Sequence, residues 1–380
     1  MKKELNYSRA IFLLLLCICV ILVGAVLKIT AEVVLPVIVA IMLAFVFQPV
    51  LVFLKKKFHI PNVLGILVIF VILLAAIFVI GNLLFSSVKT IISVYPKYEE
   101  RFLYVYKAFA EIFHLSYDDE SGLFTNLWNQ LGIRNAIQSL GLSLSNGLID
   151  FAKNLTVVAL FVIFFLSETA LFKAKAIAAM DGKSPGKIMS MVKDIVLQVT
   201  RYLSVKFFIS LLTGVLVFLG TMVVGLDFPI IWGFLAFVLN FIPNFGSILS
   251  GVLTTLFALL QFWPSFGQVV WVAFVMLSVN MVLGNFIEPK VQGRSLGLSP
   301  FVIIVSLSVW GWIWGFMGMI LAVPMMVILK IICENVEFLR PISIVMGSKV
   351  PSKLEPNNNE HESASTEPSS GVEADSSGNI

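Results

Sequence analysis

The chain has 380 residues, of which 59% are hydrophobic and only 13% are Asp, Glu, Lys or Arg. Soluble domains are on average about 45–50% apolar and about 25% charged, so this composition excludes a water-soluble globule. The net charge of +4 is small and spread over several segments, which gives no basis for a nucleic-acid partner. We therefore expect an all-α polytopic membrane protein whose main partner is the lipid bilayer.

Five runs are long and apolar enough to cross a membrane. A helix needs roughly 20 apolar residues to cross a bilayer core about 30 Å thick, with every backbone group bonded internally. The runs are 10–27, 33–54, 63–85, 155–172 and 207–224. The first resembles a signal peptide, but it exceeds the usual apolar core of about 7–15 residues and lacks a small-residue cleavage site. We predict that it is retained as a helix.

Lysines and arginines predict the orientation, because short cytoplasmic loops collect them. Bases lie at 2–9, at 55–57 and from Lys173 to Lys206, which we assign to a third basic loop. All three agree with alternating crossings that begin in the cytoplasm. The pattern places residues 88–150 outside and both termini in the cytoplasm.

The apolar runs and the composition between and after them divide the chain into four parts. Residues 1–87 form N-terminal transmembrane helices, and 151–345 form a transmembrane transport core. Between them, 88–150 carries apolar residues at three- and four-residue steps, which predicts an amphipathic extracytoplasmic helical segment. That segment could form a capping layer that shields the membrane helices, or it could gate the entry of substrate. Residues 346–380 are rich in Pro, Asn, Glu, Ser and Gly, which predicts a disordered cytoplasmic tail.

Two later runs are too long for single straight crossings. Residues 230–262 are interrupted at Pro243–Gly246, and residues 301–329 at Gly311, Gly315 and Gly318. Straight helices of those lengths would measure about 50 and 43 Å. We predict that each is two arms meeting at a break, either as full crossings or as re-entrant hairpins.

Polar residues within the apolar runs predict the site. Asn240 and Asn244 flank the first break, and Asn280, Gly284 and Glu288 follow the same four-residue spacing, so each set lies on one helical face. Facing one another, the two sets would form a polar seam. Substrate lining and simple packing of helices through amide hydrogen bonds are both consistent with that seam.

Two carboxylates are candidates for ion coupling. Glu168 lies near the cytoplasmic end of its run, where an interfacial role and a coupling role are both open. Glu288 could form an ion pair with Lys290 that holds the loop, or carry protons. All three histidines, His59, His114 and His361, lie outside the apolar runs, so we expect no metal site, no cofactor and no enzymatic activity.

Four motifs in the second half resemble the autoinducer-2 exporter (AI-2E) family, also called the PerM permease family. They are FIPNFGS at 241–247, GNFIEPK at 284–290, GRSLGLSP at 293–300, and WGWIWG at 310–315 followed by Gly318 and LAVP at 321–324. The resemblance covers roughly residues 11–339. It implies a permease of the bacterial cytoplasmic (inner) membrane with about eight membrane segments, assembled as a homo-oligomer. The matching positions are Pro243, Gly246, Asn285, Pro289, Gly293, Pro300, Gly315, Gly318 and Pro324; Gly311 adds a GxxxG pattern with Gly315.

These observations lead to three functional hypotheses. The first is secondary transport or export of a small polar solute, such as the quorum-sensing signal autoinducer-2 that some family members export, along Asn240, Asn244, Asn280, Asn285 and Glu288. The second is exchange of a monovalent cation for a proton through Glu168 or Glu288, as the resemblance also implies. The third is a non-transporting membrane scaffold.

Overall fold

The computed structural model describes residues 7–112, 152–168, 185–292 and 297–348, together with the isolated residues 139, 143, 147, 149 and 150. Those residues are almost entirely helical, as the sequence predicted. Residues 349–380 of the predicted tail and most of residues 113–150 of the predicted amphipathic segment lie outside the described residues. The helices are α1 (Tyr7–Ile29), α2 (Ala31–Phe58), α3 (Asn62–Ile112), α6 (Pro185–Val223), α7 (Pro229–Leu239), α8 (Phe245–Phe262), α9 (Phe266–Val279), η1 (Asn280–Ile287), α10 (Glu288–Gln292), α11 (Pro300–Asn335), η2 (Glu337–Leu339) and α12 (Arg340–Met346).

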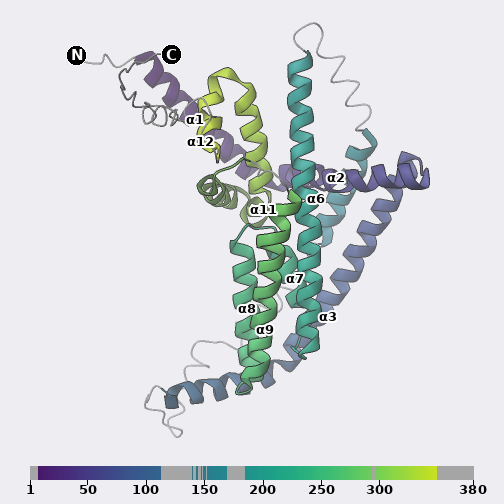
Figure 1. Cartoon of the computed structure of the whole chain (residues 1–380), viewed down its shortest axis with the longest axis vertical. Coiled ribbons are helices and arrows are strands. Elements are labelled where there is room, and N and C mark those ends of the chain that lie inside the picture. The colour runs from purple at the N-terminus through teal and green to yellow at the C-terminus, as the bar shows by residue number, and fades with distance from the viewer. Residues whose placement is uncertain are drawn as a thin grey trace, which may run out of the picture.

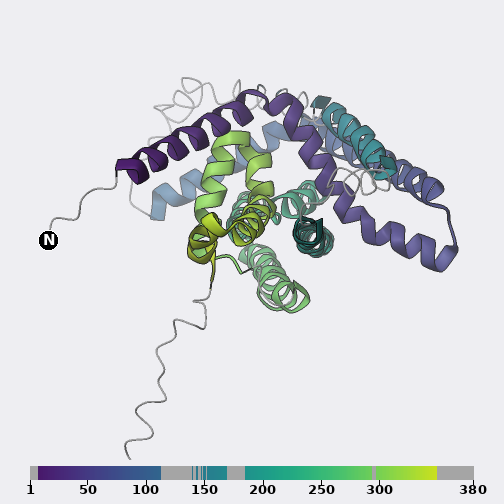
Figure 2. The same cartoon turned by 90° about the horizontal axis from the view of Figure 1, so that it is seen from above.

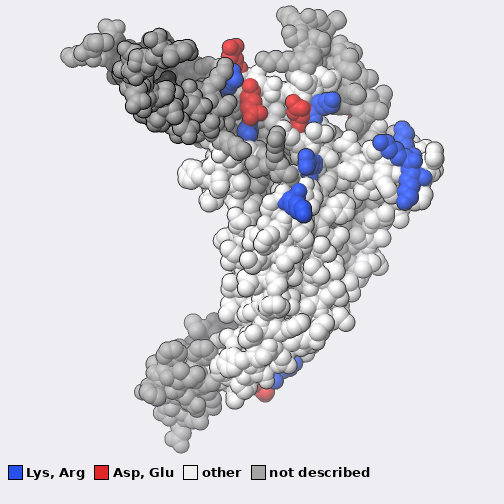
Figure 3. Space-filling view, in the orientation of Figure 1, with Lys and Arg blue, Asp and Glu red and all other residues white. Residues whose placement is uncertain are grey.

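Six of the described helices are long and apolar enough to cross a membrane. They are Ala31–Phe58, Val63–Ile91, Met189–Val223, Phe245–Phe262, Phe266–Gln292 and Pro300–Asn335. Figure 3 shows the charged side chains gathered toward the two ends of this face, with an uncharged belt over the lower half between them. An uncharged belt between charged ends is typical of a membrane protein, because an unpaired charge is costly in hydrocarbon.

The helices at the centre run along the long axis of the molecule. Figure 1 shows α6, α8 and α9 standing nearly parallel, and Figure 2 shows them almost end-on. In both views α2 lies across this axis instead of along it. Its residues nevertheless form the predicted continuous helix, which packs against α6.

The third basic loop that the sequence predicted is largely helix. Helix α6 begins at Pro185, so the bases from there to Lys206 belong to it. Lys206 is buried. It therefore cannot serve as a loop charge that marks the cytoplasmic side, and that part of the orientation argument is wrong.

The largest core cluster joins α2, α6 and α11. Val199 and Tyr202 of α6 pack with Trp310, Ala322 and Val327 of α11, and all five are buried. Full burial of one large apolar side chain is worth roughly 1.5–3 kcal/mol relative to exposure to water. In a bilayer the gain comes mainly from close packing, since lipid is as apolar as the side chains. The cluster fixes α11 beside α6.

The predicted break in 230–262 is confirmed. Helix α7 ends at Leu239, a turn follows, and α8 begins at Phe245. Gln261, at the far end of α8, donates to the carbonyl of Gly225 at 2.9 Å and accepts from the amide of Asp227 at 2.8 Å. Because Asp227 lies just before α7, these bonds hold the two bases together. Helices α7 and α8 therefore form one hairpin whose tip is the turn at residues 240–244.

The predicted break in 301–329 is also confirmed, at Trp314 and Gly315. Gly315 has a φ of +61°, and both residues leave helical geometry inside α11. The Ser306 hydroxyl donates to the carbonyl of Ala322 at 3.0 Å, so the two arms lie side by side. A side chain at Gly318 would meet the carbonyl oxygen of Trp310 at 1.8 Å. The close contact of the arms therefore requires glycine at that position.

Helix α3 continues past the predicted boundary at residue 87 and reaches Ile112 without interruption. Beyond its candidate span, the Tyr98 hydroxyl donates to Asp227 at 2.5 Å and Lys97 donates to the same carboxylate at 3.0 Å. Arg101 donates to the carbonyl of Trp263 at 3.3 Å. Since Asp227 and Trp263 stand at the two bases of the α7–α8 hairpin, α3 holds both bases in place.

Burial and the bond to Asp227 raise the pKa of Tyr98 far above its usual range, so its phenol stays protonated and able to donate. We predict that Tyr98→Phe destabilises the fold by about 1.5–3 kcal/mol, the usual effect of losing a hydrogen bond to a charged group. Unfolding of the purified protein in detergent measures this. Tyr104→Phe, on the same helix but exposed, is the control. Equal stability of the two variants would contradict the assigned bond.

Candidate functional site

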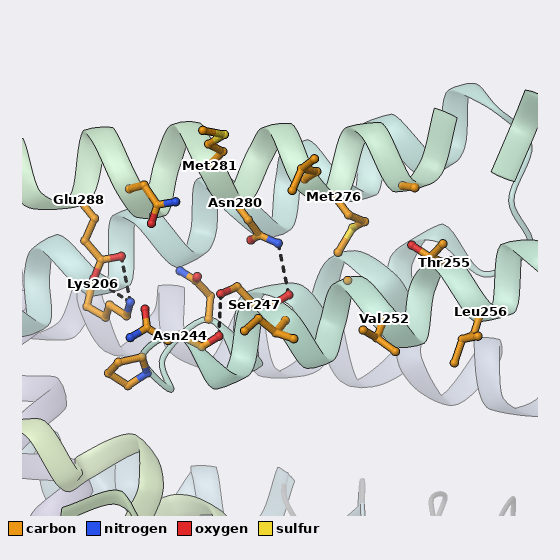
Figure 4. Close-up of a pocket in the computed structure, with 18 residues that line it drawn as sticks. Lys206, Asn244, Ser247, Val252, Thr255, Leu256, Met276, Asn280, Met281 and Glu288 are labelled. Carbon is orange, nitrogen blue, oxygen red and sulfur yellow. Dashed lines mark hydrogen bonds and ion pairs between the residues drawn. The ribbon is translucent and has the colours of Figure 1, made fainter. Parts of the chain in front are cut away.

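A groove of about 660 Å³ runs between α8 and α9, with Lys206 of α6 at one end. Its polar lining includes Asn240, Asn244, Asn280, Asn285 and Glu288, which are the five residues that the sequence assigned to the substrate path. Ligand pockets are usually about 300–1,000 Å³, so the groove can hold a small molecule. Figure 4 shows Lys206, Glu288 and Asn244 grouped at one end and Val252 and Leu256 at the other.

An ion pair closes the polar end of the groove. The Lys206 ammonium lies 2.7 and 3.0 Å from the two oxygens of Glu288 (Figure 4), and the two side chains are only 5% and 16% exposed. The predicted partner of Glu288, Lys290, is exposed instead. That prediction is wrong because Glu288 points from α10 toward α6, not along its own loop. The pair ties α10 to α6 across the groove.

The asparagines divide into two engaged and two open amides. Asn240 donates to the hydroxyl of Ser210 at 3.0 Å, and Asn280 donates to the carbonyl of Ser247 at 3.3 Å. These bonds join the hairpin tip to α6 and α8 to η1, as expected of amides that pack helices. Asn244 and Asn285 are exposed, and neither side chain makes a hydrogen bond within the described part of the chain. Their donors and acceptors are free for a ligand.

A π-helix sets which residues face the groove. The segment η1 covers Asn280–Ile287. In an α-helix Asn280 and Asn285 would point in different directions, whereas the wider π-helical turn aligns residues five apart. Both asparagines consequently line the groove, together with Gly284 and Glu288. Short π-helical segments occur frequently at functional sites.

The backbone of the first break shapes the polar end. Asn244 has a φ of +60°, a conformation that non-glycine residues rarely adopt. A side chain at Gly246 would meet the carbonyl oxygen of Leu239 at 1.7 Å, so only glycine allows α8 to begin so close to α7. Pro243 lines the groove beside them. Pro243 and Gly246 of the family motif shape the backbone here without contributing polar side chains of their own.

The remaining predicted positions lie elsewhere. Pro289 follows Glu288 in α10, Pro300 begins α11, and Gly293 lies outside the described residues. Glu168 does not line the groove, and neither do the predicted positions around the break in α11. Those positions are Gly311, Gly315, Gly318 and Pro324. They shape α11, where Pro324 is fully buried. Within the described residues no three His, Cys, Asp or Glu side chains are grouped as metal ligands.

Lys206 is a groove-lining residue that the sequence analysis did not single out. It stands between Leu203 and Phe207 in an otherwise apolar stretch that continues the predicted crossing. A lysine within an apolar run is rare and normally has a partner, so that context was the available signal. Because Lys206 was assigned to the end of a basic loop, its pairing with Glu288 was not predicted.

Comparison with known proteins agrees with the motifs. The family described as AI-2E family transporter matches residues 11–338. A candidate transport protein of Borreliella burgdorferi is 32% identical over 354 residues, covering 91% of this chain and 95% of the relative. One from Haemophilus influenzae is 32% identical over 341 residues, covering 88% and 95%. The AI-2 transport protein TqsA of Escherichia coli is 28% identical over 327 residues, covering 84% and 91%. The chain therefore belongs to the AI-2E transporter family.

Proposed function

We propose that this chain is a secondary transporter that moves a small polar solute across the bacterial cytoplasmic membrane along the α8–α9 groove. The observation that carries the proposal is the collection of open amides and a buried ion pair in a groove between two membrane-length helices. Polar groups inside a membrane cost free energy unless they contact a ligand or a polar partner. Resemblance to TqsA supports autoinducer-2 as the solute.

The hairpin geometry supports a path at the break. Helix α7 has 11 residues, about 16 Å, which is too short to cross a bilayer core of about 30 Å alone. We therefore propose that α7 and α8 form a re-entrant hairpin whose tip, at residues 240–244, lies within the membrane. Irregular backbone at that depth is tolerated where it lines a water-filled cavity. We also propose a homo-oligomer with both termini in the cytoplasm.

Autoinducer-2 export tests this proposal. Vesicles that contain the purified protein should release preloaded autoinducer-2 faster than vesicles without protein. Asn244→Leu should slow the release about tenfold, as expected when a hydrogen bond to the solute worth about 1.4 kcal/mol is lost. Asn82→Leu, on α3 and outside the groove, is the control because its amide bonds only to its own helix. Release by Asn244→Leu at the wild-type rate would refute the site.

The cation–proton alternative makes a different prediction. An antiporter would move protons when sodium is added, and a pH-sensitive dye inside the same vesicles would report it. The geometry favours solute transport, because Lys206 already neutralises Glu288 within the groove. We expect no dye response to sodium.

A further inference from the structure

The groove changes character along its length. The ion pair Lys206–Glu288 and the open amides of Asn244 and Asn285 lie at one end, while Val252 and Leu256 line the other. Leu277 lines the groove from α9, on the stretch between Met276 and Asn280 that faces Gly251. Figure 4 shows this separation along α8. Asn244 and Leu256 are twelve residues apart, which corresponds to about 18 Å along a helix. A solute with a polar group alone would occupy only the first part of that length.

The apolar end is open to the side. Val252, Leu256 and Leu277 line the groove and are still 50%, 57% and 68% exposed. Gly251 lies between the two ends with no side chain, which keeps the groove continuous. A solute with an apolar arm could rest against these side chains and leave water. Each methylene group removed from water strengthens binding by roughly fourfold.

The polar end is balanced in charge. Lys206 and Glu288 neutralise each other, so a net cation or anion would have to compete with an existing pair. Asn244 and Asn285 each offer an amide donor and an acceptor. These groups suit a neutral head that carries hydroxyl or amide groups.

We propose that the groove binds amphipathic solutes, with a neutral polar head at Asn244 and Asn285 and an apolar arm along Val252, Leu256 and Leu277. This inference rests on the proposed function, because it specifies the class of solute that the transport groove accepts. It also gives the sideways opening a role: the apolar arm can enter from the lipid while the head passes along the polar end.

A photoreactive hexyl glucoside tests the proposal, with a diazirine at the end of its alkyl chain. The full chain in lipid nanodiscs is irradiated with the probe, and the adducts are mapped by mass spectrometry. We expect adducts on Val252, Leu256 and Leu277. Phe274 is the internal control, because it is 60% exposed and one residue from groove-lining Ala273 but does not line the groove. Unlabelled hexyl glucoside should compete about fifteenfold better than butyl glucoside, since it has two more methylenes, and methyl glucoside should compete least.

Matched variants separate binding from ordinary lipid contact. Gly251→Leu should remove the groove adducts, because a side chain there meets only ordinary contacts at 3.9 Å and extends into the groove. Gly81→Leu on α3 has open space around it and should change nothing. Equal labelling of Phe274 and the groove, or labelling unaffected by Gly251→Leu, would overturn the proposal. The proposal would also be overturned if the groove stays unlabelled because a second copy of the chain covers it. If vesicles still export autoinducer-2 in that case, only this inference fails, and the proposed function stands.

Discussion

Lys206→Ala should destabilise the folded protein by about 3–5 kcal/mol, the usual cost of leaving one partner of a buried ion pair without the other. The substitution leaves the Glu288 carboxylate 16% exposed and without its nearest positive charge. The ion pair also links α6 to α10, so its loss should loosen the polar end of the groove. Chemical or thermal unfolding in detergent, together with the yield of monodisperse protein, measures the effect.

Two further variants make the result specific. Lys290→Ala removes an exposed lysine two residues from Glu288 and should change stability by less than about 1 kcal/mol. Replacing Lys206 and Glu288 together by Met should recover much of the loss, because no unpaired charge then remains. If Lys206→Ala is as stable as Lys290→Ala, the ion pair contributes nothing to the fold.

Gly246→Ala and Gly318→Ala should each prevent normal folding. The added carbon would lie 1.7 Å from a carbonyl oxygen of Leu239 in the first variant and 1.8 Å from that of Trp310 in the second. Both neighbours are backbone atoms, which cannot rotate away as a side chain can. The hairpins would have to open, at a cost above the roughly 4–5 kcal/mol that marks an exceptional substitution. Expression level and monodispersity in detergent provide the measurement.

Glycines in open helices are the matched controls. Gly24 in α1 and Gly81 in α3 have no atom within 4 Å of an added carbon. Alanine at either position should be tolerated, or should stabilise its helix by about 0.5–1 kcal/mol. Comparable loss of folded protein in all four variants would mean that the hairpin contacts have no special importance.

The two breaks could be predicted because their causes are local. Proline and glycine interrupt apolar runs that are too long for one helix, and both signals are visible in the sequence around Pro243 and Gly315. The structure places the interruptions at those positions. The count of about eight segments stays a prediction, since six helices within the described residues qualify by length and composition.

The contacts across the groove could not be predicted, because they depend on how distant helices pack. Periodicity placed Asn280 and Glu288 on one face, but no local pattern showed that Asn285 joins them through π-helical turns. Sequence proximity favoured Lys290 as the partner of Glu288, whereas packing supplied Lys206, which is 82 residues away. The tie between Tyr98 and Asp227 spans 129 residues and was unforeseen for the same reason.

Autoinducer-2 release from vesicles that contain a groove-filling variant tests the central claim, that solute moves between α8 and α9. Gly251→Leu inserts a side chain into the groove, and Gly81→Leu adds the same side chain to α3 away from it. Both proteins are reconstituted at equal amounts after their unfolding curves have been shown to agree with the wild type. The transport path described above predicts that Gly251→Leu stops release while Gly81→Leu preserves it. Release by Gly251→Leu at the wild-type rate would contradict it.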